Sequence, residues 1–221
     1  MVVDDPAKRA AGVAALDEVR AGMTIGLGTG STVAYFLDAL AADGPSGVRG
    51  VPTSEATRRR GEELGLDLLA PDEVDRLDLV VDGADELTPA LDLTKGGGGA
   101  LLREKVVAEM SDGMVVVATP DKVVDRLAES FALPIEVVPF AVGPVRRRLA
   151  ARGYVVQLRD GHTDNGNVIL DARLPGGIEQ PGEEATWLSS VAGVAEHGLF
   201  IDLAVVALLG RPDGTVTRLE A

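Results

Sequence analysis

Residues 77–105 read LDLVVDGADELTPALDLTKGGGGALLREK and combine an apolar run, a dense group of charged residues and four glycines. The apolar run at the start predicts a strand that ends at Asp82, and Asp85 follows three residues later. Lys95, one of only four lysines in the sequence, precedes four consecutive glycines. A helical pattern begins after these glycines and carries Glu104 in its first turns. The stretch therefore predicts a strand and a helix whose connection is rich in charged groups and bare backbone.

Several explanations of this connection are open from the residues alone. An acidic turn after a strand is common, because Asp side chains accept hydrogen bonds from nearby backbone N–H groups. The four glycines, 96–99, form either a flexible loop or a backbone that approaches a ligand, and Glu104 would then face the same ligand. A divalent metal site is disfavoured, because no His or third carboxylate stands at ligand spacing and Lys95 would repel a cation. We therefore expect no metal ion here.

Upstream, residues 26–32 read GLGTGST between a predicted strand and a predicted helix. Glycines let backbone N–H groups point into such a loop, and the helix that follows presents its positive end. The loop lacks the third glycine of the dinucleotide fingerprint and the Lys of a nucleotide triphosphate loop. Hydroxyl groups at Thr29, Ser31 and Thr32 add donors suited to a small phosphate monoester. The alternative is a merely tight turn between strand and helix.

Strands and helices alternate over the first 130 residues, which predicts a Rossmann-like α/β domain whose mostly parallel sheet has helices on both faces. Lys122 follows the fourth strand, at the carboxyl edge where open α/β sheets bind ligands. Ser54 is predicted to cap a helix. The predicted strands are 23–27, 48–52, 77–82 and 114–118, and the predicted helices are 5–20, 33–40, 57–64, 100–110 and 121–127.

The order of predicted strands and helices changes near residue 133. The order strand, helix, strand, strand, helix, strand predicts a small α+β ferredoxin-like domain inserted at 131–204. A closing hairpin at 205–219 is expected to return to the first sheet, so the α/β domain would comprise 1–130 and 205–221. The elements of the insert are strands at 134–140, 154–158, 167–172 and 198–201, with helices at 142–152 and around Trp187.

Composition limits the classes of partner. The net charge of −14 disfavours nucleic acid and anionic membranes, because both require a basic surface. No apolar stretch is long enough to span a membrane, and the acidic start of the chain does not resemble a signal peptide. The absence of cysteine fits a cytoplasmic protein. The acidity indicates either adaptation to high salt or simply an acidic, soluble protein.

The remaining polar residues have simpler explanations. We expect His162 and His197 to be surface or hydrogen-bonding residues rather than catalysts. Trp187 is expected in a core. The two arginine triplets, 58–60 and 146–148, are predicted to lie on solvated helix faces.

The motifs GLGTGST, VPTSEAT, VVDGADE, KGGGGALLREK, ATPDK and TDNGN occur in this order, and with them the chain resembles the ribose-5-phosphate isomerase A family. The resemblance covers nearly the whole chain, from about Lys8 to the final PDG turn. DGADE followed by KGGG and REK at this spacing is highly specific. GLGTGST alone is also found in sugar-phosphate deaminases and CoA transferases of related fold. At Gly99 a small residue such as Ala is also expected in the family.

The resemblance implies conversion of ribose 5-phosphate to ribulose 5-phosphate through an enediolate, without metal or organic cofactor, by a homodimer or homotetramer. Glu104 would be the proton-transferring base, Asp82 and Asp85 would move hydroxyl protons, and Lys95 would stabilise the enediolate charge. The residues implied to bind the sugar phosphate are Thr29, Gly30, Ser31, Thr32, Gly83, Ala84, Gly96, Gly97, Gly98 and Lys122.

Two other classes of function compete with an isomerase. A non-catalytic sugar-phosphate sensor of a transcription regulator would need a DNA-binding helix-turn-helix, whereas the sheet domain here begins by Met23. Another sugar-phosphate enzyme of the same fold, such as an amino-sugar-phosphate deaminase, would share GLGTGST. A CoA transferase would require a Glu nucleophile and a nucleotide site. The order of the motifs favours the isomerase.

Overall fold

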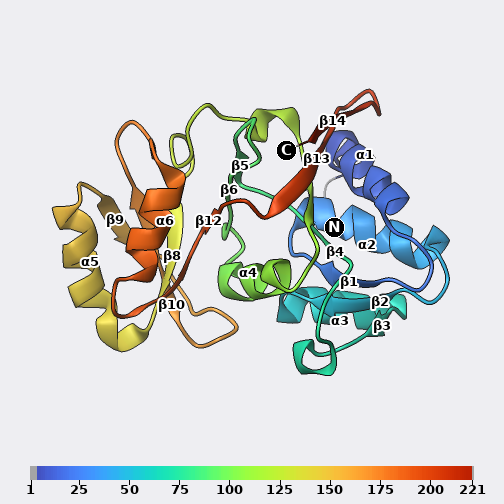
Figure 1. Ribbon diagram of the computed structural model, residues 1–221, viewed down its shortest axis with the longest axis horizontal. Coiled ribbons are helices and arrows are strands. Elements are labelled where there is room, and N and C mark those ends of the chain that lie inside the picture. The colour runs from blue at the N-terminus through green and yellow to red at the C-terminus, as the bar shows by residue number, and fades with distance from the viewer. Residues whose placement is uncertain (1–3, 221) are drawn as a thin grey trace. The chain divides into compact units, whose positions relative to one another are not determined.

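The computed structural model describes residues 4–220 and divides them into two compact units (Figure 1). Unit 1 comprises 4–84, Arg103–Lys122 and 203–220. Unit 2 comprises Asp85–Leu102 and Val123–Asp202, so it includes 85–102 and 123–130 in addition to most of the predicted insert. The division into domains at 1–130 with 205–221 and at 131–204 remains a prediction.

Unit 1 is built on a sheet with the strand order β14-β13-β7-β4-β1-β2-β3. Neighbouring strands are parallel, except for the antiparallel pair β13 and β14. The mostly parallel α/β sheet and the return of the closing hairpin to it are thereby confirmed. The strands are β1 (Thr24–Leu27), β2 (Arg49–Pro52), β3 (Asp67–Leu68), β4 (Leu79–Asp82), β7 (Met114–Ala118), β13 (Ala204–Gly210) and β14 (Val216–Glu220).

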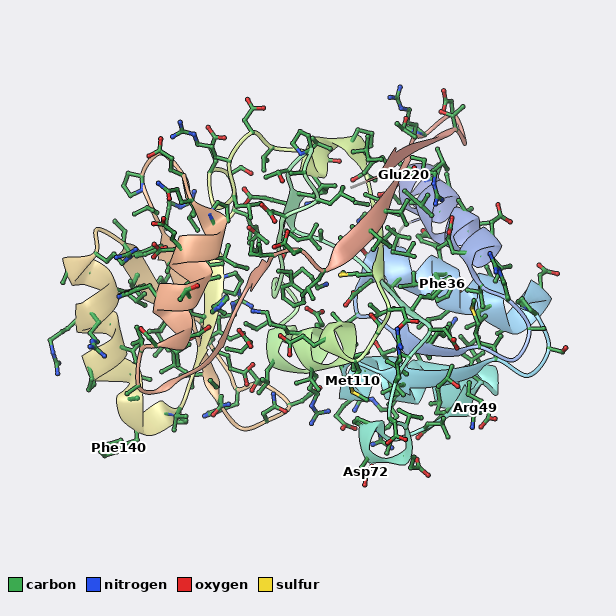
Figure 2. The ribbon with its side chains drawn as sticks, viewed as in Figure 1. Phe36, Arg49, Asp72, Met110, Phe140 and Glu220 are labelled. Carbon is green, nitrogen blue, oxygen red and sulfur yellow. The ribbon has the colours of Figure 1, made fainter. Side chains whose placement is uncertain are left out.

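Helices cover both faces of this sheet. Phe36 of α2, which is fully buried, belongs to the cluster that packs α1 and α2 against one face (Figure 2). On the other face Val107 of α4 lies over Gly26, where an added β-carbon would be 2.5 Å from the valine methyl. The helical segments are α1 (Pro6–Ala14), η1 (Ala15–Glu18), α2 (Ser31–Asp43), α3 (Glu55–Leu64), η2 (Pro71–Glu73), α4 (Leu101–Glu109) and η3 (Pro120–Lys122).

Local chemistry sets where these helices begin and end. Ser54 accepts a hydrogen bond from the Thr57 N–H group at 3.0 Å and caps α3, as predicted. Gly65 ends the same helix in the left-handed conformation, with φ of 72°. The predicted helix at 121–127 is wrong beyond Lys122. The N–H group of Val124 donates to the Leu87 carbonyl of β5, and Leu127 forms an isolated bridge with Ile178, so this backbone makes tertiary hydrogen bonds instead of helical turns.

Unit 2 contains a four-stranded antiparallel sheet in the order β11-β8-β10-β9, with a helix after its first and third strands in chain order. This is the arrangement of a ferredoxin-like fold, as predicted. Its apolar core joins the sheet to both helices. Phe140, in contrast, projects from η4 and is 96% exposed (Figure 2). The elements are β8 (Leu133–Val137), η4 (Pro139–Ala141), α5 (Val142–Ala151), β9 (Val155–Leu158), β10 (Val168–Arg173), α6 (Pro181–Ser189) and β11 (Val194–His197).

Unit 2 also has a small three-stranded sheet that the sequence did not predict. It joins β5 (Glu86–Leu87), β6 (Leu93–Thr94) and β12 (Leu199–Phe200) in the order β12-β6-β5. The strand predicted at 198–201 therefore belongs to this sheet, and β11 completes the four-stranded sheet in its place. Within residues 4–220, none of the helices has the length and apolar character needed to cross a bilayer.

Asp92, in the connection between β5 and β6, carries a carboxyl group whose ionisation is expected to lower the stability of the fold. Burial and the negative charge of Asp202 raise the pKa of the Asp92 carboxyl above its ordinary value. Because the folded state then favours the protonated form, the ionised carboxylate destabilises the fold at neutral pH. We predict that Asp92→Asn raises the free energy of unfolding at pH 7 and that this gain disappears as the pH falls through the raised pKa.

Thermal unfolding between about pH 3 and about pH 7 measures this difference. The matched control is Asp160→Asn, which removes an exposed carboxylate of the same unit. A gain for Asp92→Asn that is equally large at both ends of the pH range would contradict the prediction.

Candidate functional site

The loop after β1 is fixed by the carboxylate at the end of β4. Because β1 and β4 are parallel neighbours, their carboxyl ends meet, and the Gly28 N–H group donates to the Val81 carbonyl at 2.9 Å. Asp82 Oδ1 accepts hydrogen bonds from the backbone N–H groups of Thr29 at 3.0 Å and Gly83 at 2.7 Å. A β-carbon at Gly28 would lie 2.3 Å from Asp82 Cγ. The close approach of Asp82 therefore requires glycine at this position.

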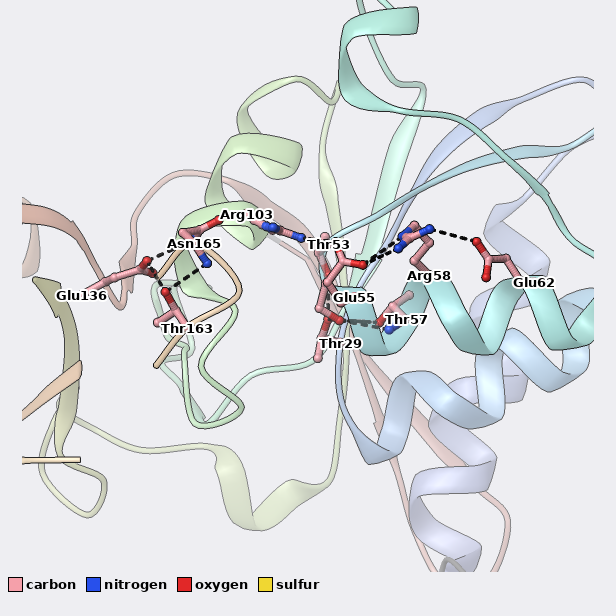
Figure 3. Close-up of polar contacts among 11 residues, drawn as sticks. Thr29, Thr53, Glu55, Thr57, Arg58, Glu62, Arg103, Glu136, Thr163 and Asn165 are labelled. Carbon is pink, nitrogen blue, oxygen red and sulfur yellow. Dashed lines mark hydrogen bonds and ion pairs between the residues drawn. The ribbon is translucent and has the colours of Figure 1, made fainter. Parts of the chain in front are cut away.

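A cluster of hydroxyl groups holds the loop after β1 in place through hydrogen bonds. Thr29 Oγ1 lies 2.8 Å from both Thr53 Oγ1 and Ser54 Oγ and 3.1 Å from Thr57 Oγ1 (Figure 3). Thr57 Oγ1 also donates to the Gly28 carbonyl at 2.8 Å. The Thr29 hydroxyl, predicted as a donor to phosphate, is thus part of the protein's own network. The VPTSEAT motif supplies its partners.

The N-terminus of α2 has the features of an anion site. Gly30 is its N-cap, with a φ of 132° that favours glycine, and no side chain caps the first turn of this 13-residue helix. Lys8 Nζ donates to Ser31 Oγ at 3.1 Å and lies 3.7 Å from Asp5 Oδ2. Backbone N–H groups at 31–33, the helix dipole and a lysine together can bind a phosphate group.

Lys8 is a candidate residue that the sequence reasoning missed. It stands in α1, and its partner Ser31 is 23 residues away, so no local motif connects them. The available signal was the rarity of lysine in a strongly acidic chain.

Glu104 is a buried carboxylate in α4, with 4% of its surface exposed. Its neighbour Arg103 donates to Glu55 Oε1 of α3 at 2.9 Å. The guanidinium groups of Arg58 and Arg103 hold the pKa of Glu55 below its ordinary value, so that partner is ionised at neutral pH. Figure 3 shows Arg58 joined to Glu55 and Glu62. The pair between Arg103 and Glu55 joins the start of α4 to α3, and a buried carboxylate on a helix held in this way can act as a general base.

Lys122 lies where the sequence predicted, just beyond the carboxyl end of β7. It is the last residue of η3, its N–H group donates to the Thr119 carbonyl at 3.0 Å, and its side chain is partly buried. Among residues 4–220, no carboxylate forms an ion pair with its ammonium group. A partly buried ammonium group without a carboxylate partner can bind an anionic ligand.

In unit 2, Asp85 is held against the glycine loop, which we define as residues 96–99. Asp85 Oδ2 accepts a hydrogen bond from the Gly97 N–H group at 2.7 Å. The loop is a turn in which the Gly99 N–H group donates to the Gly96 carbonyl at 3.0 Å, with positive φ at both residues (105° and 81°). Because φ of Gly99 is left-handed, alanine at this position would be strained in this chain.

Lys95 is buried beside this loop, with 3% of its surface exposed. Its N–H group donates to the Gly198 carbonyl at 2.8 Å, and Nζ lies 5.5 Å from the centroid of the Phe200 ring. A cation near an aromatic face in a buried setting has few waters to screen it. Lys95 can therefore stabilise negative charge strongly.

Glu86, the last residue of DGADE, has a structural role. It is 1% exposed, and its carboxylate accepts hydrogen bonds from the N–H groups of Ala128, Ser130 and Phe131 and from the Ser130 hydroxyl, at 2.7–2.9 Å. This acid holds the 128–131 segment to β5, whereas Asp82 and Asp85 hold the two loops.

The candidate residues are thus divided by unit. Residues of different units are nevertheless close in the sequence. Asp82 of unit 1 and Asp85 of unit 2 are three residues apart, and Lys95 of unit 2 and Glu104 of unit 1 are nine apart. Unit 1 contains Thr29, Gly30, Ser31, Thr32, Asp82, Gly83, Ala84, Glu104 and Lys122, and unit 2 contains Asp85, Lys95, Gly96, Gly97 and Gly98.

The two histidines differ in their exposure to solvent. His162 is exposed. His197 is buried, with Nε2 3.1 Å from Ser189 Oγ and Nδ1 accepting from the Leu199 N–H group at 3.3 Å. Within the described residues, no group of three or more His, Asp or Glu side chains is arranged to hold a metal ion.

Comparisons with known proteins point to one family. The family model for ribose 5-phosphate isomerase A (phosphoriboisomerase A) matches residues 49–214. Ribose-5-phosphate isomerase A of Rhodopseudomonas palustris (strain HaA2) is 49% identical over 224 residues, which cover 95% of this chain and 96% of the relative.

Two solved structures are similar over nearly their full length. A D-ribose-5-phosphate isomerase in complex with phospho-erythronic acid is 37% identical, with a TM-score of 0.93 and coverage of 97% of both chains. Ribose 5-phosphate isomerase A from Neisseria gonorrhoeae is 36% identical, with a TM-score of 0.93 and coverage of 100% of this chain and 98% of that chain.

The anion site at α2 can be tested through Lys8. We predict that Lys8→Met weakens binding of inorganic phosphate about tenfold, because a hydrogen-bonded charge next to Ser31 is lost. Titration calorimetry measures the affinity. The matched control is Arg9→Met, which removes one positive charge from the same helix, where Arg9 pairs with Asp4 and covers the Tyr35 ring. Equal losses in both variants would mean that only net charge matters and would contradict the assignment of Lys8.

Proposed function

Because this chain belongs to the ribose-5-phosphate isomerase A family, we propose that it interconverts D-ribose 5-phosphate and D-ribulose 5-phosphate. The observation that carries the mechanism is the burial of a cationic side chain and a carboxylate on one short stretch of chain. Lys95 and Glu104 are nine residues apart, and both are at least 95% buried. Ordinary packing places such charged groups at the surface.

The reaction moves a proton from C2 of the aldose to C1 of the ketose. A base must remove the C2 proton, hold it while an enediolate forms and return it to C1. We assign this role to Glu104. Its burial limits access of bulk water, which strengthens its electrostatic interactions with the substrate and slows, without preventing, exchange of the captured proton with solvent.

Negative charge grows on the sugar oxygens as the proton leaves. Lys95 supplies a buried cation for this charge, a contribution of the kind often equivalent to about 3 kcal/mol. In the glycine loop the Gly97 N–H group donates to Asp85, so Gly98 provides the next backbone N–H group that a sugar oxygen can reach.

Asp82 and Asp85 would move the hydroxyl protons during ring opening and isomerisation. Each is held by backbone N–H groups, Asp82 by Thr29 and Gly83, and Asp85 by Gly97. Because one oxygen of each carboxylate is hydrogen-bonded to the backbone, the other oxygen has a fixed orientation in which it can meet a substrate hydroxyl group. The phosphate group of the substrate would bind at the N-terminus of α2 with Lys8, together with Gly30, Ser31 and Thr32.

Assay of the purified chain with ribose 5-phosphate tests the function directly. The proposed isomerase forms ribulose 5-phosphate without added cofactor. A non-catalytic sensor would bind ribose 5-phosphate without converting it, and a CoA transferase would require an acyl-CoA. The cytoplasmic location expected from the sequence, and the homodimer or homotetramer implied by the family, remain predictions.

Glu104→Gln tests the base. We predict a loss of kcat of about 100-fold or more, because glutamine cannot accept the C2 proton. KM should change little, since the amide has the size and shape of the carboxylate. The matched control is Glu109→Gln, which changes an exposed residue of the same helix and should retain full activity. A folded Glu104→Gln variant that keeps more than about a tenth of wild-type turnover would exclude Glu104 as the base.

A further inference from the structure

We propose that Arg159 is a positioning residue for this reaction, one that fixes the glycine loop through its carbonyl groups. The inference rests on the proposed function, in which this loop binds the sugar oxygens. Arg159 lies just after β9, and its Nη1 donates to the carbonyl of Gly96 at 2.8 Å and to that of Gly97 at 3.1 Å. A single guanidinium nitrogen thus holds two consecutive peptide groups.

The loop needs a partner of this kind because it has no side chains. Glycine loses more backbone freedom on folding than any other residue, and a loop without β-carbons cannot be held by packing. Gly97 and Gly98 are also exposed. Their order therefore depends on hydrogen bonds to the backbone, of which Arg159 provides two.

The guanidinium is itself held rigidly. Its Nε and Nη2 donate to the two oxygens of Asp171 at 2.9 and 2.5 Å, and both side chains are about three-quarters buried (25% and 26% exposed). The Arg159 N–H group donates to the Ile169 carbonyl at 2.9 Å and continues the pairing of β9 with β10. A bidentate pair fixes the plane of the guanidinium, so Nη1 is directed to the loop.

The loop's peptide geometry connects this contact to catalysis. In a trans peptide the carbonyl and the N–H group point in opposite directions, and the described residues contain no cis peptide bond. The peptide from Gly96 to Gly97 offers its carbonyl to Arg159 and its N–H group to Asp85. By the same rule, holding the Gly97 carbonyl fixes the direction of the Gly98 N–H group, which donates to no acceptor within residues 4–220. Arg159 thereby orients the N–H group proposed to meet the enediolate oxygen.

The segment that follows Arg159 is secured at a second point. Glu136 of β8 is fully buried, and its Oε1 accepts hydrogen bonds from Thr163 Oγ1 at 2.8 Å and from Asn165 and Asn167 Nδ2 at 3.0 Å each (Figure 3). This explains the TDNGN motif as the means by which the β9–β10 connection is tied to β8. The β9–β10 connection is therefore held both at Arg159 and at residues 163–167, which limits movement of Arg159 relative to the glycine loop.

The test uses Arg159→Met in the full-length enzyme. If Arg159 orients the oxyanion donor, kcat falls about 10- to 100-fold while KM for ribose 5-phosphate changes less than about threefold. Affinity for phospho-erythronic acid, whose carboxylate resembles the planar enediolate, should fall by a similar factor. Affinity for inorganic phosphate should not change. Arg159→Lys should recover only part of kcat, because lysine cannot pair with Asp171 and reach both carbonyls.

The matched control is Arg152→Met, which breaks a bidentate pair with Glu184 in the same unit but contacts no part of the glycine loop. It should lower the unfolding temperature and leave kcat unchanged. A folded Arg159→Met variant with kcat within about twofold of wild type would overturn the inference. If Arg159→Met does not fold, Asp171→Asn takes its place, with the same expected loss of kcat and the same overturning result.

NMR of the loop amides separates this inference from the proposed function. In Arg159→Met the Gly98 resonance should broaden or shift relative to wild type, and an unchanged resonance would overturn the inference whatever the activity. A wild-type chain that leaves ribose 5-phosphate unchanged would refute the proposed function, and the Gly98 resonance would then decide whether Arg159 orders the loop.

Discussion

The parallel pairing of β1 with β4 is the constraint on which the candidate site depends. It brings the ends of two strands together and lets one carboxylate, Asp82, accept hydrogen bonds from the backbones of both Thr29 and Gly83. The approach is possible only because Gly28 has no β-carbon. From this junction the chain leads into α2 on one side and through Gly83 and Ala84 on the other, so one carboxylate positions both the 28–30 loop and the end of β4.

The two glycine-rich loops share a second principle, which is that polar side chains from distant segments hold bare backbone in place. The Thr57 hydroxyl binds the Gly28 carbonyl, and the Arg159 guanidinium binds the carbonyls of Gly96 and Gly97. Each glycine costs roughly 0.5–1 kcal/mol more to order than alanine, so these hydrogen bonds offset a real entropic loss. The ordered backbone can then present N–H groups that need no reorganisation when charge develops on a substrate.

Sequence patterns predicted the features that depend on residues close together in the chain, such as strand bounds and helix caps. β7 has the predicted bounds, and Ser54 caps α3 as expected. The three-stranded sheet was missed because strands of two residues have no periodicity to detect. The contact of Lys8 with Ser31 and that of Arg159 with Gly96 join residues 23 and 63 positions apart. Such contacts follow from the tertiary fold, and no local spacing reports them.

We propose that a protein base carries the proton from C2 to C1 through an enediolate. Converting ribose 5-phosphate in D₂O and measuring deuterium at C1 of ribulose 5-phosphate by NMR tests this proton transfer. A carboxylate that holds the proton can exchange it with solvent before returning it, so we expect deuterium at C1. Complete absence of deuterium over repeated turnovers would indicate direct hydride transfer between the carbons and would contradict it.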